Sequence, residues 1–140
     1  MTFNKLTPNF EVSNIRETVH FYQSVLGFNL TMAATENKDG IEQKLESGKE
    51  YVYALLVKDK VEIMLQRSDS FKRDIALAED HEIGASVSFY MEIEGLNELY
   101  SSIKGKIKNI TEPKIAWYGM REFYIKDPNG YILGFAEKTE

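Results

Sequence analysis

The stretch "REFYIKDPNGYILGFAE" (Arg121–Glu137) has a shortened counterpart earlier in the chain, "YALLVKDKVEIMLQR" (Tyr53–Arg67). In both stretches, two apolar runs flank a short polar segment that contains Lys-Asp. This is the pattern of a β-hairpin, and Asp-Pro-Asn-Gly in the second copy is a strong turn signal. The recurrence predicts that the chain contains two copies of one structural unit.

The first copy extends from the N-terminus to its hairpin. Leu6–Val12 alternates between apolar and polar residues, as a half-buried strand does. Asn14 and Glu17 form a capping box at the start of an amphipathic helix, which we expect to end at Gly27. Asn29–Ala34 is a further strand candidate, and the polar segment after it predicts a loop or hairpin tip.

The second copy repeats this order. Val87–Ile93 alternates, a helix with Leu96 and Ile103 on its apolar side follows, and Ile107–Ile110 is the third-strand candidate. Each half therefore predicts strand, helix, strand, strand, strand. We expect a single α+β domain over residues 1–140, built from two βαβββ modules (1–67 and 85–140) and a linker (68–84).

The alternation also predicts which side chains point away from the helices. One module covers only one face of its sheet, so two modules together predict a curved mixed sheet with a concave cleft on the other face. The residues expected to face this cleft share the parity opposite to the strictly apolar positions. They are Thr7, Asn9, Glu11, Glu62, Met64, Gln66, Ser86, Ser88, Tyr90, Glu92, Ile132, Gly134 and Ala136.

Composition limits the possible functions. The absence of cysteine excludes a disulfide scaffold, a thiolate metal site and a cysteine nucleophile. A net charge of −5 argues against nucleic acid as a partner. No apolar run approaches the ~20 residues of a membrane span. We expect a cytoplasmic protein with neither a nucleic-acid nor a membrane partner.

The two ends of the chain resemble one known superfamily. The opening "TPNFEVSNIRETVHFYQSVLGF" (Thr7–Phe28) and the closing "YGMREFYIKDPNGYILGFAE" (Tyr118–Glu137) are similar to the vicinal oxygen chelate superfamily. That superfamily contains glyoxalases, bleomycin resistance proteins and extradiol dioxygenases. The resemblance implies paired βαβββ modules, and it also implies a homodimer.

Enzymes of this superfamily hold a divalent metal with His or Glu from the first and last strand of each module. The resemblance places these ligands at Thr7, Met64, Ser88 and Gly134, none of which offers an imidazole or carboxylate. We expect His20 and His81 to be structural or solvated. A metal site is therefore not expected, nor is any cofactor, and the chain is most similar to the metal-free bleomycin-resistance-like members.

Those members bind small molecules in grooves lined by aromatic side chains. Trp117 precedes the closing hairpin and is expected at the rim of a pocket, with core packing as its alternative. For Tyr90, the cleft and the core are equally favoured. The candidate ligand-binding residues are those on the cleft parity or close to the closing hairpin. They are Asn9, Glu62, Met64, Gln66, Ser88, Tyr90, Trp117, Tyr118, Arg121 and Glu122.

Three hypotheses of function follow. The leading one is a metal-free small-molecule-binding protein that forms a homodimer. The second is a glyoxalase-like lyase or isomerase, or a dioxygenase-family member, that uses either an undetected metal or Glu62, Tyr90 or Glu122 as acid or base. The third is a structural or regulatory module whose cleft is filled by its own side chains, such as Met64.

Overall fold

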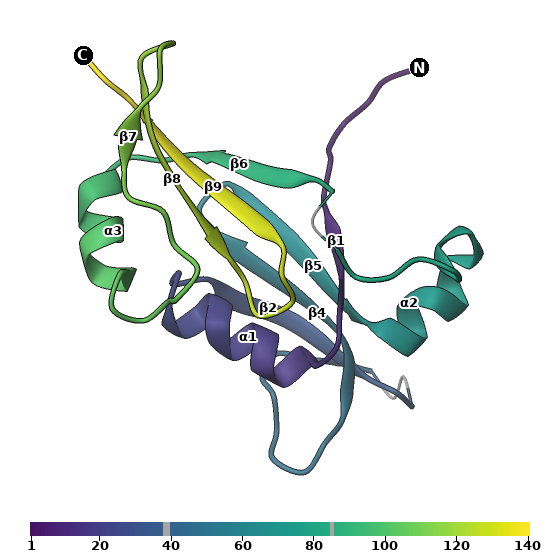
Figure 1. Cartoon of the computed structure of the whole chain (residues 1–140). Helices are drawn as coiled ribbons and strands as arrows, with labels where there is room; N and C mark the ends of the chain where they lie inside the picture. Colours follow the sequence, from purple (N-terminus) through teal and green to yellow (C-terminus); the bar gives the residue numbers. More distant parts are fainter. Residues whose placement is uncertain (38–39, 85) are drawn as a thin grey trace. The chain divides into compact units, whose positions relative to one another are not determined.

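The computed structural model describes residues 1–37, 40–84 and 86–140 of the chain (Figure 1). These residues form two compact units, Met1–Ile83 (unit 1) and Gly84–Glu140 (unit 2). Residues 38 and 39, in the expected loop, and residue 85, the expected start of the second module, lie outside the described residues. Within the described ranges, every helix is too short or too polar to cross a membrane.

Unit 1 contains a five-stranded mixed sheet with the strand order β1-β5-β4-β2-β3. Strands β1 and β5 are parallel, and the other neighbours are antiparallel. The elements are β1 (Asn9–Val12), α1 (Ile15–Ser24), β2 (Asn29–Thr35), β3 (Ile41–Glu42), β4 (Tyr51–Lys58), β5 (Val61–Arg67), α2 (Ser68–Asp74) and the 3₁₀ helix η1 (Ala76–Ala78).

Local signals fix both ends of α1. The Asn14 side chain accepts a hydrogen bond from the Glu17 amide at 2.8 Å, which confirms the predicted cap. At the other end, Gly27 adopts a φ of +75°, and the Phe28 amide donates to the Tyr22 carbonyl at 2.9 Å. The helix buries an apolar side that includes Ile15 and Tyr22.

Unit 2 has a four-stranded mixed sheet with the strand order β6-β9-β8-β7. Its first and last strands, β6 and β9, are parallel, as β1 and β5 are in unit 1. The elements are β6 (Ser88–Glu92), α3 (Leu96–Ile103), β7 (Lys114–Ile115), β8 (Met120–Lys126) and β9 (Ile132–Lys138). The predicted α+β class and the βαβββ order of the second copy are confirmed.

Two strand predictions need correction. Ile107–Ile110 is not a strand, because it contributes only a single bridge between Ile110 and Ile125. The third strand is β7 instead, which pairs with β8 beside the turn at residues 117–119. Pro113 separates the two segments and has no amide hydrogen for a continuous ladder. The first strand begins at Asn9, and Leu6 is 88% exposed.

The segment expected as a linker contains α2 and η1. Helix α2 contacts β5 and β1, and Ser70 is its buried residue. The Gln66 side chain donates a hydrogen bond to Ser70 of this helix. Helix α2 therefore covers part of the unit 1 sheet, on the face to which Gln66 points.

The turn between β8 and β9 generates a stability prediction. Asp127 Oδ1 accepts hydrogen bonds from the amides of Asn129 and Tyr131, both at 2.9 Å, and Gly130 has a φ of +88°. A Cβ at position 130 meets no atom within 4 Å. Gly130→Ala should therefore lower the free energy of unfolding by about 1 kcal/mol through backbone strain alone.

Denaturant unfolding measures this change, and Gly105→Ala is the matched control. Gly105 also has open space around it, but its φ lies outside the left-handed region. The control should be neutral or stabilising by up to about 1 kcal/mol. Equal effects of the two substitutions would contradict the strain argument.

Candidate functional site

Tyr90, Tyr118 and Glu122 meet on one side of the unit 2 sheet. Tyr90 lies on β6, Glu122 lies on β8, and Tyr118 lies in the turn before β8. Both phenols donate hydrogen bonds to Glu122 Oε2: the Tyr118 bond measures 2.5 Å, and the Tyr90 bond is also short. We call these three residues, with Trp117 and Tyr124, the tyrosine–glutamate cluster.

The register of β9 explains why residues from β6 and β8 meet. Strand β9 lies between them, and it pairs Tyr90 with Gly134 and Glu122 with Ala136. These two positions of β9 carry the smallest side chains, and both are buried. Tyr90 can therefore reach across β9 to the carboxylate on β8.

The ring of Tyr124 lies directly over Gly134. A Cβ built on Gly134 would be 2.7 Å from Tyr124 Cε1 and 3.1 Å from Cδ1, distances at which the ring must move. Tyr124 lies outside the set of ligand-binding residues that the sequence predicts. The signal that identifies it is strand parity, because it lies two residues after Glu122 and thus on the same face of β8.

The Glu122 carboxylate controls the ionisation of the surrounding phenols. Its hydrogen bond raises the pKa of Tyr90, and it is also the main cause of the raised pKa of Tyr118. For Tyr124, burial raises the pKa first and the charge of Glu122 adds to it. All three phenols therefore remain protonated donors at neutral pH, while no cationic side chain among the described residues forms an ion pair with Glu122.

Trp117 extends the cluster into solvent. It is 95% exposed, and its ring meets that of Tyr118 edge to face, with the centroids 5.3 Å apart. The tight turn holds both residues outward, since the Ala116 amide donates to the Met120 carbonyl at 2.8 Å and Gly119 has a φ of +85°. The alternative of Trp117 as a core residue is wrong.

The remaining candidates of unit 2 lie outside these contacts. Ser88 is exposed on β6, where it pairs with Ile132. Arg121 is half-buried on β8 and, as the neighbour of Glu122, points to the other face of the strand.

In unit 1, the structure brings Asn9 and Gln66 together. Asn9 Nδ2 donates to Gln66 Oε1 at 2.9 Å, and Gln66 Nε2 donates to Ser70 Oγ at 2.9 Å and to Asp74 Oδ2 at 2.8 Å. Gln66 is only 8% exposed. These side-chain amides thus join β1 and β5 to α2. Within the described residues, the buried Asn9 Oδ1 accepts no hydrogen bond.

The other two candidates of unit 1 lie on β5. Glu62 accepts hydrogen bonds from Lys5 at 2.5 Å and from Thr7 at 3.3 Å, and the Lys5 ammonium lowers its pKa. Met64 is half-buried and pairs with Asn9. A buried carboxylate that the site prediction left out, Glu11, accepts a hydrogen bond from Ser68 at 2.5 Å.

The positions that the resemblance assigns to metal ligands do not fit a metal centre. Thr7 donates its hydroxyl to Glu62, Met64 offers a thioether, and Gly134 has no side chain and lies under Tyr124. Across the described ranges, no group of three or more His, Asp or Glu residues is arranged to hold a metal ion.

The chain belongs to the glyoxalase/bleomycin resistance protein/dioxygenase superfamily, whose pattern it matches over residues 8–135. It is 27% identical to a bleomycin resistance protein from Geobacillus stearothermophilus, an alignment that covers 95% of this chain and 96% of the relative. The resemblance inferred from the opening and closing segments is thereby confirmed.

Solved structures share the fold at lower sequence identity. A glyoxalase-related enzyme from Clostridium phytofermentans has a TM-score of 0.69 at 17% identity, covering 99% of this chain and 97% of that one. A bleomycin-binding protein from bleomycin-producing Streptomyces verticillus, in complex with copper(II)-bleomycin, has a TM-score of 0.60 at 15% identity, covering 100% and 98%.

The cluster generates a prediction for pH titration. Because Glu122 raises the pKa of Tyr90 and Tyr118, Glu122→Gln should shift part of the tyrosinate absorbance to lower pH. The stability from these bonds is complete below about pH 10, the pKa of tyrosine in an unfolded chain, and is lost as pH rises through the higher folded values.

Near-ultraviolet absorbance during alkaline titration measures this shift. The control is Glu94→Gln, which removes the same charge from an exposed position of unit 2. If Glu122→Gln and Glu94→Gln titrate alike, the carboxylate does not control the phenols.

Proposed function

We propose that this chain is a metal-free small-molecule-binding protein and that the tyrosine–glutamate cluster recognises a cationic ligand with a planar group. The observation that carries the proposal is the Glu122 carboxylate, which accepts two phenol hydrogen bonds but has no cationic partner among the described side chains. A ligand cation would supply that partner.

The rings around Glu122 suit the planar part of such a ligand. Tyr90 and Tyr118 are 47% and 50% exposed, so both offer ring surface beside the carboxylate, and Trp117 adds an exposed indole. A cation over an aromatic face gains roughly 0.5–2 kcal/mol, depending on its desolvation. Stacked aromatic groups add about 0.5–1.5 kcal/mol beyond the buried area. The cluster combines both contacts with one negative charge.

The relatives support the class of ligand. One is named a bleomycin resistance protein, and a structural neighbour holds copper(II)-bleomycin. We therefore propose a planar, cationic compound of the bleomycin kind. The metal-free part of the proposal is supported by the side chains at positions 7, 64, 88 and 134, which lack imidazole and carboxylate donors.

The competing hypotheses have weaker support. As a catalytic base, Glu62 is disfavoured because Lys5 lowers its pKa. In Glu122, both phenol hydrogen bonds end on the same oxygen, Oε2, which is therefore already occupied and less accessible to a substrate proton. A face filled by its own side chains does not agree with the exposure of Tyr90 and Trp117 in unit 2.

Titration of the single tryptophan tests the binding proposal. Metal-free bleomycin and the planar cation proflavine should change Trp117 emission in the presence of EDTA, whereas neutral 2-naphthol should bind more weakly. Loss of a cation–π contact should weaken proflavine binding by about 2- to 30-fold in Trp117→Ala and by less in Trp117→Phe. Because these two variants contain no tryptophan, their binding is measured from the fluorescence of proflavine itself. Glu122→Gln should weaken binding of both cations.

Controls separate binding from folding. Trp117 is 95% exposed, so Trp117→Ala should leave the unfolding midpoint unchanged, and Glu94→Gln should leave affinity unchanged. If both cations bind Glu122→Gln as tightly as the original chain, the cluster is not the site. If EDTA abolishes binding, the metal-free part is wrong.

The proposal includes a cytoplasmic homodimer. Outside the cluster, large apolar side chains of unit 2 are exposed at Ile115 and Val87, and such side chains are typical of interaction surfaces when they form a patch. Light scattering should give a mass of twice 16.1 kDa. A mass of one chain across a wide concentration range would contradict the dimer.

A further inference from the structure

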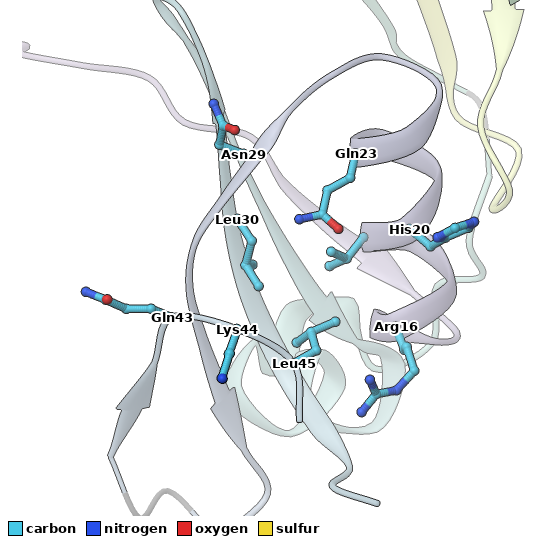
Figure 2. A pocket seen from close by; sticks show the side chains of 9 residues that line it. Arg16, His20, Gln23, Asn29, Leu30, Gln43, Lys44 and Leu45 are labelled. Carbon is cyan, nitrogen blue, oxygen red and sulfur yellow. The ribbon is translucent and has the colours of Figure 1, made fainter. Parts of the chain in front are cut away.

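Unit 1 contains a hollow that takes no part in the proposed function. It has a volume of about 450 Å³ and lies between α1, the start of β2 and the segment 43–45 (Figure 2). Sites for small molecules usually have volumes of roughly 300–1,000 Å³. The hollow is therefore large enough for a small organic ligand.

The base of the hollow is apolar. Val19 of α1 is almost completely buried, and Leu30 of β2 and Leu45 are half-buried. In Figure 2, Leu30 and Leu45 point into the space between helix and strand, while the ring of His20 points away from it. These apolar groups form a surface that would bury the hydrocarbon part of a ligand.

Positive charge gathers at one end of the hollow. Arg16 and Lys44 both line it, at the end opposite Asn29 (Figure 2). Arg16 is held in place, because its Nη2 donates to the carbonyls of Glu46 at 2.7 Å and Lys49 at 3.0 Å. Its guanidinium also lies 5.6 Å from the centre of the Tyr51 ring.

The acidic side chains close to this end are already paired with another lysine. Lys49 Nζ lies 3.1 Å from Glu42 and 3.1 Å from Glu46. None of the lining residues is acidic, and neither Arg16 nor Lys44 forms an ion pair with a carboxylate of the described residues. In a chain of net charge −5, this hollow thus has a cationic end.

From these features we propose that the hollow is a second binding site, specific for an amphipathic organic anion. Its carboxylate would lie near Lys44 and Arg16, and its short hydrocarbon body would cover Leu30 and Leu45. The Gln23 amide points toward the same space and offers an additional donor (Figure 2). The ligand charge is opposite to that proposed for the cluster of unit 2, so the two sites have different specificities.

Amide chemical shifts of the ¹⁵N-labelled full chain test the proposal. Octanoate should shift amides around residues 19, 30 and 43–45. The matched probes octanol and octylamine have the same hydrocarbon body, and they should bind at least about fivefold more weakly because they lack the charge attraction.

Matched variants test the residues. Lys44→Gln should weaken octanoate binding by about fivefold, and Leu45→Ser should weaken octanoate and octanol together. Lys60→Gln removes the same charge from the exposed β4–β5 turn and should leave octanoate binding unchanged. Proflavine binding, read from Trp117, should be unaffected by Lys44→Gln, which separates this proposal from that of unit 2.

Three outcomes would overturn the inference. They are an absence of shifts in these amides with octanoate at millimolar concentration, binding of octylamine as tight as that of octanoate, and equal octanoate affinity of Lys44→Gln and Lys60→Gln. Because Lys44 and Leu45 lie in a loop outside the core, a thermal melt of each variant checks that the fold is intact.

Discussion

The parallel pairing of the first and last strand is the constraint on which each unit depends. Parallel neighbours cannot be joined by a tight turn, so the chain must leave β1 or β6 and return by way of other elements. In both units, a helix follows the first strand and packs on one face of the sheet, where Tyr100 of α3 meets Phe123 of β8. In each unit, the other face of its own sheet is thereby left to polar and aromatic side chains. Asn9 and Gln66 lie on that face in unit 1, and Tyr90 and Glu122 lie on it in unit 2.

The two units use this face differently. In unit 1, α2 covers Gln66, and the hydrogen bonds of the two amides hold strands and helix together. In unit 2, small residues on β9 leave room above the sheet, and the phenols converge on one carboxylate while remaining half exposed. The repeated topology has thus produced an internal polar network in one copy and an accessible, negatively charged aromatic surface in the other.

Local signals explain how much of the fold could be predicted from sequence. The bounds of β4, β5 and α3 follow from alternation, helical periodicity and turn residues, and the Asn14 cap is a contact between near neighbours. The displacement of the third strand to β7 depends on Pro113 and on the turn after Ala116, which together outweigh the apolar pattern of Ile107–Ile110. Strand parity placed Tyr90 on the cleft-facing side, but its bond to Glu122 spans 32 residues and requires the register of three strands. The covering of Gln66 by α2 is likewise a tertiary contact that no local pattern encodes.

The close contact between Tyr124 and Gly134 restricts how this protein can change during evolution. Any side chain introduced at 134 meets the ring, so a metal-binding carboxylate cannot be acquired there by one substitution without displacing Tyr124. If Tyr124 is lost first, the ring contact over the glycine backbone disappears before any ligand has been gained. The two positions are therefore expected to vary together among related sequences, and the gain of a metal ligand at 134 requires an intermediate that has neither the ring contact nor the ligand. The contact of the Tyr124 ring with Gly134 therefore disfavours substitutions that would introduce a metal ligand at position 134.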